Sequence, residues 1–160
     1  MRSAVEYVRL AGDLLIASIH WGGNWGYAIS AAERNFAHRL VDTGFAVVHG
    51  HSSHHPKAIE VYLDRLILYG CGEFRNDYEG ISGHDEYRGE LSQMYLPPLC
   101  AATGRLTDLR LVPFKIARFQ LHRASIADAT WLQQRLDAES QPFGVGVTLD
   151  CDGTLSARRR

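Results

Sequence analysis

Three histidines of this sequence, His20, His51 and His54, stand where apolar runs give way to glycine or serine. The run before His20 covers residues 14–19, and the run before His51 covers residues 45–48. Short apolar runs of this kind are typical of buried strands that end in a loop. In open α/β sheets, ligands bind beyond the carboxyl ends of parallel strands. Because imidazole nitrogens bind zinc, manganese and iron, we expect these three histidines to form a site for a divalent metal ion.

The region around His51 is rich in histidine, with His49, His54 and His55 close to it in the sequence. We expect His51 and His54 to be the ligands, because an i, i+3 pair on a tight loop can converge. His49 lies inside the strand run and is expected to face the core or to support the ligands from behind. Pro56 favours an extended backbone at His55, which turns that ring away from the metal. The alternative is a polar loop whose histidines only cap backbone groups.

The segment between the two histidine blocks predicts a helix that joins two parallel strands. Ser30 and Glu33 have the spacing of a capping box, and Gly44 suits the position just past a helix end. A short strand–helix–strand connection is right-handed and leaves its two strands parallel. We therefore expect His20 and His51 to lie side by side at one end of the sheet.

The rest of the chain predicts further strands and a second helix. We expect a hairpin over 59–69 with its turn at Asp64 and Arg65, a surface loop over 75–90, strands over 91–101 and 106–117, a helix from Ser125, and a closing hairpin over 145–155. Pro97 and Pro98 keep the 91–101 strand away from the centre of its sheet. The unbroken apolar run over 14–19 predicts a first strand buried on both faces. The expected fold class is α/β, a mixed sheet with flanking helices.

Composition excludes several classes of function. The length of 160 residues fits one domain, and 46% hydrophobic residues are enough for a core. A formal net charge of −1 gives no reason to expect binding to nucleic acid or to an anionic membrane surface. The early apolar run is too short for a membrane segment or a signal peptide, so we expect a cytoplasmic location. The three cysteines form no CxxC pair, which favours a reducing compartment.

The order and spacing of these motifs resemble those of a known family, the capsule and poly-γ-glutamate biosynthesis proteins (CapA-like), which are similar to the calcineurin-like metallophosphatases. The motifs that carry the resemblance are His20-Trp21-Gly22, Gly50-His51 with His54, and the segments 59–62 and 68–74. The resemblance covers roughly residues 10–155. It implies a phosphoesterase-type site in which His20, His51 and His54 bind manganese, zinc or iron.

Five further residues are expected near the metal, where they would bind substrate or support the ligands: Trp21, His49, His55, Glu73 and Asn76. Trp21 could instead pack inside the protein. Glu73 stands where the family's Gly-Asn-Phe or Gly-Asp-Phe signature has a shorter side chain, so it has one more methylene of reach.

The resemblance is to the carboxyl-terminal half of the family's domain, the half of a metallophosphatase-type αββα sandwich. The family's Asn-His motif does not occur, and Gly12-Asp13 lies on the wrong side of the His20 strand to serve as its Gly-Asp motif. We therefore expect residues 1–160 to form a single, partial domain that lacks a bridging carboxylate. Such a domain would be a metal-dependent hydrolase once the amino-terminal half is supplied, and it could form a homo-oligomer.

The leading interpretation is a capsule or poly-γ-glutamate biosynthesis protein that acts on a phosphorylated or polyglutamate-related substrate. One alternative is a truncated or accessory module that keeps the histidines without catalysis. Another is a metal-dependent phosphoesterase that acts on an unrelated metabolite.

Overall fold

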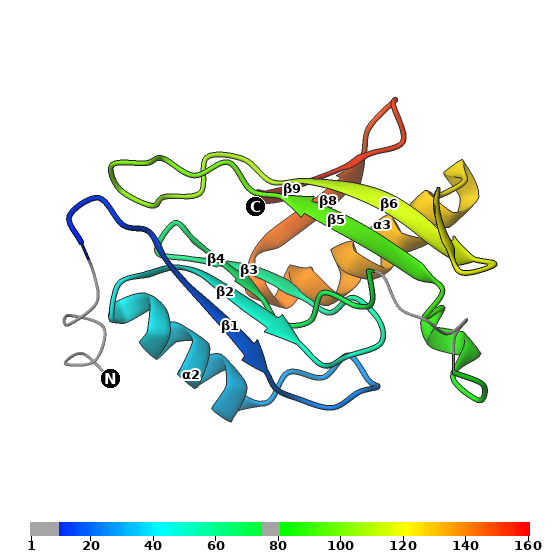
Figure 1. The fold of residues 1–160 in the computed structure, drawn as a ribbon, viewed down its shortest axis with the longest axis horizontal. Helices are drawn as coiled ribbons and strands as arrows, with labels where there is room; N and C mark the ends of the chain where they lie inside the picture. Colours follow the sequence, from blue (N-terminus) through cyan, green and yellow to red (C-terminus); the bar gives the residue numbers. More distant parts are fainter. Residues whose placement is uncertain (1–9, 75–80) are drawn as a thin grey trace.

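The computed structural model describes residues 10–74 and 81–160, which form two β-sheets and two helices (Figure 1). The first sheet is mixed and has the strand order β1-β2-β4-β3. Its strands are β1 (Leu15–His20), β2 (Phe45–His51), β3 (Ile59–Tyr62) and β4 (Arg65–Leu68). β1, β2 and β4 are parallel, and β3 runs antiparallel to β4. The expected α/β class is confirmed.

Helix α2 (Ala31–Asp42) connects β1 to β2 and covers one face of this sheet (Figure 1). The predicted capping box is present, since the Ser30 hydroxyl accepts a hydrogen bond from the Glu33 backbone N–H and the Glu33 carboxylate accepts one from the Ser30 backbone N–H. Gly44 follows the helix with φ of +104°, a conformation that favours glycine. The helix packs its buried face, which consists of Ala37, Leu40 and Val41, against the sheet.

The pairing of β1 with β2 contains one irregularity. The register shifts after Leu15, so that Ala46 of β2 has no counterpart in β1. Beyond this shift the pairing is regular, and His20 at the end of β1 lies opposite His51 at the end of β2. The two predicted strands are thus parallel neighbours, and their histidines are next to each other.

The second sheet is antiparallel and has the order β5-β6-β9-β8, with β7 paired to β6. Its strands are β5 (Leu91–Leu96), β6 (Arg110–Ala117), β7 (Gln120–Arg123), β8 (Val145–Leu149) and β9 (Leu155–Arg159). Helix α3 (Ile126–Ser140) begins after the N-cap Ser125 and packs against β8. β5 is an edge strand, as the two prolines predict.

The main hydrophobic core lies between the two sheets. It combines inward-facing residues of the first sheet with residues of the second sheet and of α3: Val47, Leu66, Leu68, Leu91, Leu111, Leu132, Leu136, Val147 and Leu155. A smaller core lies on the other face of the first sheet, under α2, and includes Val48, Ile67 and Tyr69. No helix in the described parts of the chain is long and apolar enough to cross a membrane.

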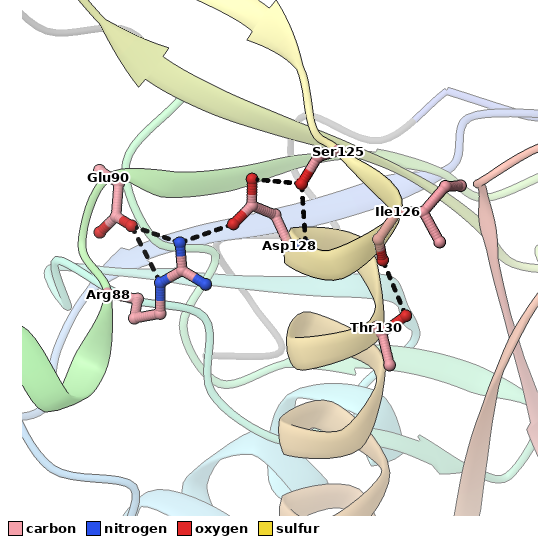
Figure 2. Close-up of polar contacts among 6 residues, drawn as sticks. All are labelled: Arg88, Glu90, Ser125, Ile126, Asp128 and Thr130. Carbon is pink, nitrogen blue, oxygen red and sulfur yellow. Dashed lines mark hydrogen bonds and ion pairs between the residues drawn. The ribbon is translucent and has the colours of Figure 1, made fainter.

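The segment before β5 is fastened to the start of α3 by Arg88 (Figure 2). The Arg88 guanidinium donates hydrogen bonds to Glu90 and to Asp128, with Nη2 at 2.7 Å from a carboxylate oxygen of each. Asp128 in turn accepts from the Ser125 hydroxyl at 2.8 Å and lies in the first turn of the helix. Tyr87, which precedes Arg88 in the sequence, stacks on His55 of the loop after β2, with ring centroids 4.7 Å apart.

Several sequence predictions need correction. The turn between β3 and β4 consists of Leu63 and Asp64, both with positive φ, because such a turn matches the twist of the flanking strands. Strands β5 and β6 are shorter than expected, and β7 was not predicted at all. The prediction that the first strand is buried on both faces is wrong, because β1 is an edge strand and Ile16 is 60% exposed.

Candidate functional site

The site is built around His20 and His51, at the carboxyl ends of two parallel strands. Their ring centroids are 5.3 Å apart, and the rings are inclined at 67°. Both side chains lie on the face of the sheet away from α2, because residues opposite each other in neighbouring strands point to the same face. His20 is exposed and His51 is partly buried, so the pair is open to ligands.

His49 extends this pair along the same face of β2. Its ring centroid is 5.7 Å from that of His51, and its Nδ1 lies 3.2 Å from the Ser18 hydroxyl oxygen. Burial lowers the pKa of His49, and the neighbouring His51 lowers it further. His49 is therefore a neutral imidazole near pH 7, and the Ser18 hydroxyl orients its ring next to His51.

His54 lies apart from the pair, on the loop that follows β2. Its Nδ1 forms an ion pair with Glu73, and its ring lies 5.1 Å from that of Trp25. Among residues 10–74 and 81–160, no three or more His, Cys, Asp or Glu side chains are grouped so that they could hold a metal ion. The structure thus brings His20 and His51 together but does not complete a three-histidine group with His54.

Glu73 reaches the histidine loop from the segment after β4. The backbone carbonyl of Glu73 accepts a hydrogen bond from the Ser92 hydroxyl, which anchors it to β5. Its carboxylate contacts Nδ1 of His54. Asn76, also expected near the site, lies outside the described residues.

His55 is fully buried within a cluster of aromatic rings. Its ring centroid lies 4.5 Å from Tyr27, 4.7 Å from Tyr87 and 6.0 Å from Trp25. Nδ1 donates a hydrogen bond to the Pro56 carbonyl at 3.1 Å, because a carbonyl oxygen can only accept. The buried Nε2 has no hydrogen-bond partner among residues 10–74 and 81–160. Burial lowers the pKa of His55 to about 4. His55 therefore stays neutral and is oriented toward the interior.

Trp21 packs beneath the histidine strands. Its indole N–H donates a hydrogen bond to the Tyr69 carbonyl at 3.0 Å, and its ring contacts Phe36 and Tyr69. The indole also passes over Gly50, where a Cβ atom would lie 2.2 Å from Trp21 Nε1. Glycine before His51 is thus required by this close approach. Trp21 thus packs inside the protein, which is the second of the two possibilities given for it from the sequence.

A cavity of about 580 Å³ opens between the two sheets beside the histidines. Its walls are mostly apolar, from Ile16, Val47, Leu66 and Leu68 on the first sheet and from Met94, Tyr95, Pro97 and Leu99 on the β5 side. His49 and His51 line one part of it. No single segment of sequence indicates this cavity, because its walls come from residues far apart in the chain.

The aromatic cluster around His55 was also missed from the sequence. Trp25 stacks on His84 with ring centroids 4.1 Å apart, and Arg135 of α3 lies 4.6 Å from the ring centroid of Tyr27. The abundance of aromatic residues near position 25 was the only local signal. The partners come from the segment before β5 and from α3, which only the folded chain brings together.

Comparison with known proteins adds a family to this geometry. Residues 1–78 match the family described as "Bacterial capsule synthesis protein PGA_cap", a region that contains all the histidines discussed above except His84. A protein of Mycobacterium tuberculosis named "Probable polyglutamine synthesis accessory protein" is 47% identical over 144 residues, which cover 90% of this chain. The chain spans 38% of the length of that relative.

Two further matches cover a smaller part of the chain. The "Capsule biosynthesis protein CapA" of Bacillus anthracis is 31% identical over 62 residues, or 39% of this chain and 15% of that protein. The "PGA biosynthesis protein CapA" of Bacillus subtilis is also 31% identical over 62 residues, or 39% of this chain and 16% of that protein.

Proposed function

This chain belongs to the CapA-like family of bacterial capsule synthesis proteins, and we propose that it takes part in capsule or poly-γ-glutamate synthesis through a metal-dependent phosphoesterase-type site. The observation that carries the proposal is the pairing of His20 with His51 at the strand ends, with ring centroids 5.3 Å apart. Parallel strand ends are where α/β proteins bind ligands.

The chemistry of the donor set fits a divalent metal in part. His20 and His51 offer two imidazole nitrogens on one open face, which suits zinc, manganese or iron. His54 belongs to the proposal as the third ligand, and its contact with Glu73 has the form of the carboxylate–histidine contact that orients metal-binding imidazoles. A divalent metal held by these residues would polarise a phosphoryl oxygen and lower the pKa of bound water.

Other residues of the chain would prepare the histidines for this role. Ser18 holds the ring of His49, which remains neutral beside His51 and so adds no positive charge against a cation. Trp21, fixed by its hydrogen bond to Tyr69, packs against Gly50 and makes the end of β2 rigid. Rigid support of this kind keeps ligand side chains in a productive geometry.

The proposal is tested by titrating the chain with Mn²⁺ and Zn²⁺ in a calorimeter. We expect His20→Ala and His51→Ala each to weaken binding by at least about tenfold, since loss of one ligand leaves the set open. His122→Ala, at an exposed position in β7, is the matched control and should bind as the wild type does. Binding should also weaken in acid, because a histidine that binds a metal must be a neutral imidazole. Equal affinity in all four proteins would refute the assignment.

A second candidate is a non-catalytic accessory module. It is favoured by the ligand set of the described residues, which lacks a group of three close donors, and by the word "accessory" in the name of the Mycobacterium tuberculosis relative. Hydrolysis of a generic phosphodiester by the metal-loaded chain separates the two candidates. Turnover that disappears in His51→Ala supports the enzyme, whereas metal binding without turnover supports the accessory module.

A further inference from the structure

A second cavity lies at the opposite end of the first sheet from the histidine pair. It has a volume of about 280 Å³ and is formed where β1, β2 and β4 begin, together with the loop between β5 and β6 (Figure 1). Since a strand rises about 3.3 Å per residue, Leu15 in the cavity wall and His20 are roughly 17 Å apart along β1. The cavity is therefore separate from the histidine site.

Arg65 brings a positive charge to the wall of this cavity. Within residues 10–74 and 81–160 its guanidinium forms no ion pair, and the buried Nη1 has no hydrogen-bond acceptor. The adjacent Asp64 is used elsewhere, because it pairs with Arg105 and with Arg159 at 3.0 Å each. A buried cation without a counterion costs free energy, and an anionic group of a ligand in the cavity would reduce that cost.

Asp13 brings a negative charge to the same cavity. It lies on the exposed turn before β1, where its Oδ2 accepts a hydrogen bond from the Leu10 backbone N–H at 2.9 Å. In the part of the chain that the structure describes, Asp13 forms no ion pair, either with Arg65 or with another cation. The cavity thus contains one charge of each sign, and the two do not neutralise each other.

The remaining walls are small and uncharged. They consist of Gly12, Leu14, Leu15, Gly44, Ala46, Ala101, Ala102, Thr103 and Gly104. Gly104 has φ of +69°, and a Cβ atom there would lie 3.1 Å from the Ala46 Cβ and 3.5 Å from Arg65 Nη1, so glycine keeps the space beside the guanidinium open. At about 280 Å³ the cavity is just below the usual range of roughly 300–1,000 Å³ for small-molecule sites. It therefore suits a ligand of few atoms.

We propose that this cavity binds a free α-amino acid, whose carboxylate pairs with Arg65 and whose ammonium group pairs with Asp13. An α-amino acid is a small ligand that carries both charges at pH 7. A simple anion such as phosphate would bind Arg65 but would be repelled by Asp13. A small apolar side chain suits the alanine and leucine walls, so L-alanine is the appropriate probe. Neither charge belongs to the histidine pair, so amino-acid binding does not depend on the proposed metal site.

The test is a titration of the isotope-labelled chain with L-alanine, in which NMR spectra follow the backbone amides of Gly12, Gly44 and Gly104 in the cavity wall. We expect these signals to shift until the site is saturated, while the amide signals of His20 and His51 stay unchanged. Acetate carries only the carboxylate and ethylamine carries only the ammonium group. Each should bind at least about tenfold more weakly than L-alanine, because it makes one of the two charged contacts.

Two variants separate the contributions of the two charges. Arg65→Gln should weaken the binding of L-alanine and of acetate by about tenfold or more, because both ligands lose their cationic partner. Asp13→Asn should weaken L-alanine by about tenfold without weakening acetate, and its exposed position makes it independent of whether Arg65→Gln folds. Arg105→Gln is the matched control, since it removes the same charge next to Gly104 from a side chain that does not line the cavity. This control should bind L-alanine as the wild type does.

Several results would overturn the proposal. The first is a wild-type chain whose cavity signals do not shift with L-alanine. Equal affinity of the wild type for L-alanine and acetate would show that the cavity takes an anion only. Unchanged binding of L-alanine by Asp13→Asn would remove the ammonium contact. Equal weakening by Arg65→Gln and Arg105→Gln would show that net charge, and not a site at Arg65, controls binding.

Discussion

The buried imidazole of His55 should make the stability of the protein fall steeply in mild acid. In the folded chain the ring is enclosed by Trp25, Tyr27 and Tyr87, and burial lowers its pKa to about 4. In the unfolded chain the same group has a pKa of about 6.5. Between these two pH values the unfolded state binds a proton at His55 and the folded state does not. The contribution of the neutral His55 ring to the unfolding free energy is therefore complete above pH 6.5 and is lost as the pH falls toward 4.

The size of this effect follows from the two pKa values of His55. Since it is fully buried, with an exposed fraction of 0%, the shift converts to stability without a large reduction for solvent screening. Between pH 7 and pH 5 the unfolding free energy should fall by about 2 kcal/mol. For a domain whose total stability is about 5–15 kcal/mol, that is a substantial fraction.

The assay is urea denaturation of the wild type and of His55→Phe at pH 7, 6 and 5. Phenylalanine suits the aromatic cluster and cannot be protonated. Between pH 7 and pH 5 the unfolding free energy of the variant should therefore fall by about 2 kcal/mol less than that of the wild type. His122→Gln, at an exposed position, should retain the wild-type dependence on pH. If the unfolding free energies of His55→Phe and the wild type depend on pH in the same way, the buried neutral imidazole is not the cause of that dependence.

Two further predictions concern residues that support the site. Glu60, only 3% exposed, accepts hydrogen bonds from the Tyr69 hydroxyl at 2.6 Å and from Arg34 at 3.1 Å. Glu60→Ala should therefore lower the unfolding free energy by about 3 kcal/mol. A loss as small as that of Glu139→Ala, which removes only an i, i+4 ion pair with Arg135 on α3, would contradict this. Gly50→Ala should lower the unfolding free energy by about 2 kcal/mol or more, since the new Cβ would lie 2.2 Å from the indole nitrogen of Trp21. It should also alter the near-ultraviolet circular dichroism of Trp21, and an unchanged spectrum would contradict the prediction.

Local signals in the sequence predicted the elements that place the histidine pair. The capping box of Ser30 and Glu33 and the glycine after the helix act within a few residues, so they are visible without the fold. The parallel neighbours that bring His20 beside His51 followed from the handedness of short crossovers. These parts of the fold were therefore predictable by physical rules that concern only nearby residues.

The remainder depends on contacts between distant segments. An apolar run over residues 14–19 predicts a buried strand, but it cannot distinguish a central strand from an edge strand with one apolar face left open, as in β1. Similarly, the spacing of His51 and His54 is compatible with convergence, but Glu73 comes from another segment and forms the ion pair with His54. The aromatic enclosure of His55 likewise needs Tyr87 from the segment before β5.

The register shift at Ala46 decides which residue of β2 lies opposite His20. If β1 and β2 paired without that shift, His20 would lie opposite Gly50 and would share a face with the residues under α2 instead of with His51. Deleting one residue between Val47 and His51 would place His51 opposite Ile19 and turn the two imidazoles to opposite faces, whereas deleting Ala46 would remove the shift and leave His20 opposite His51. The histidine pair therefore depends on the number of residues between Val47 and His51 as well as on the two histidines themselves.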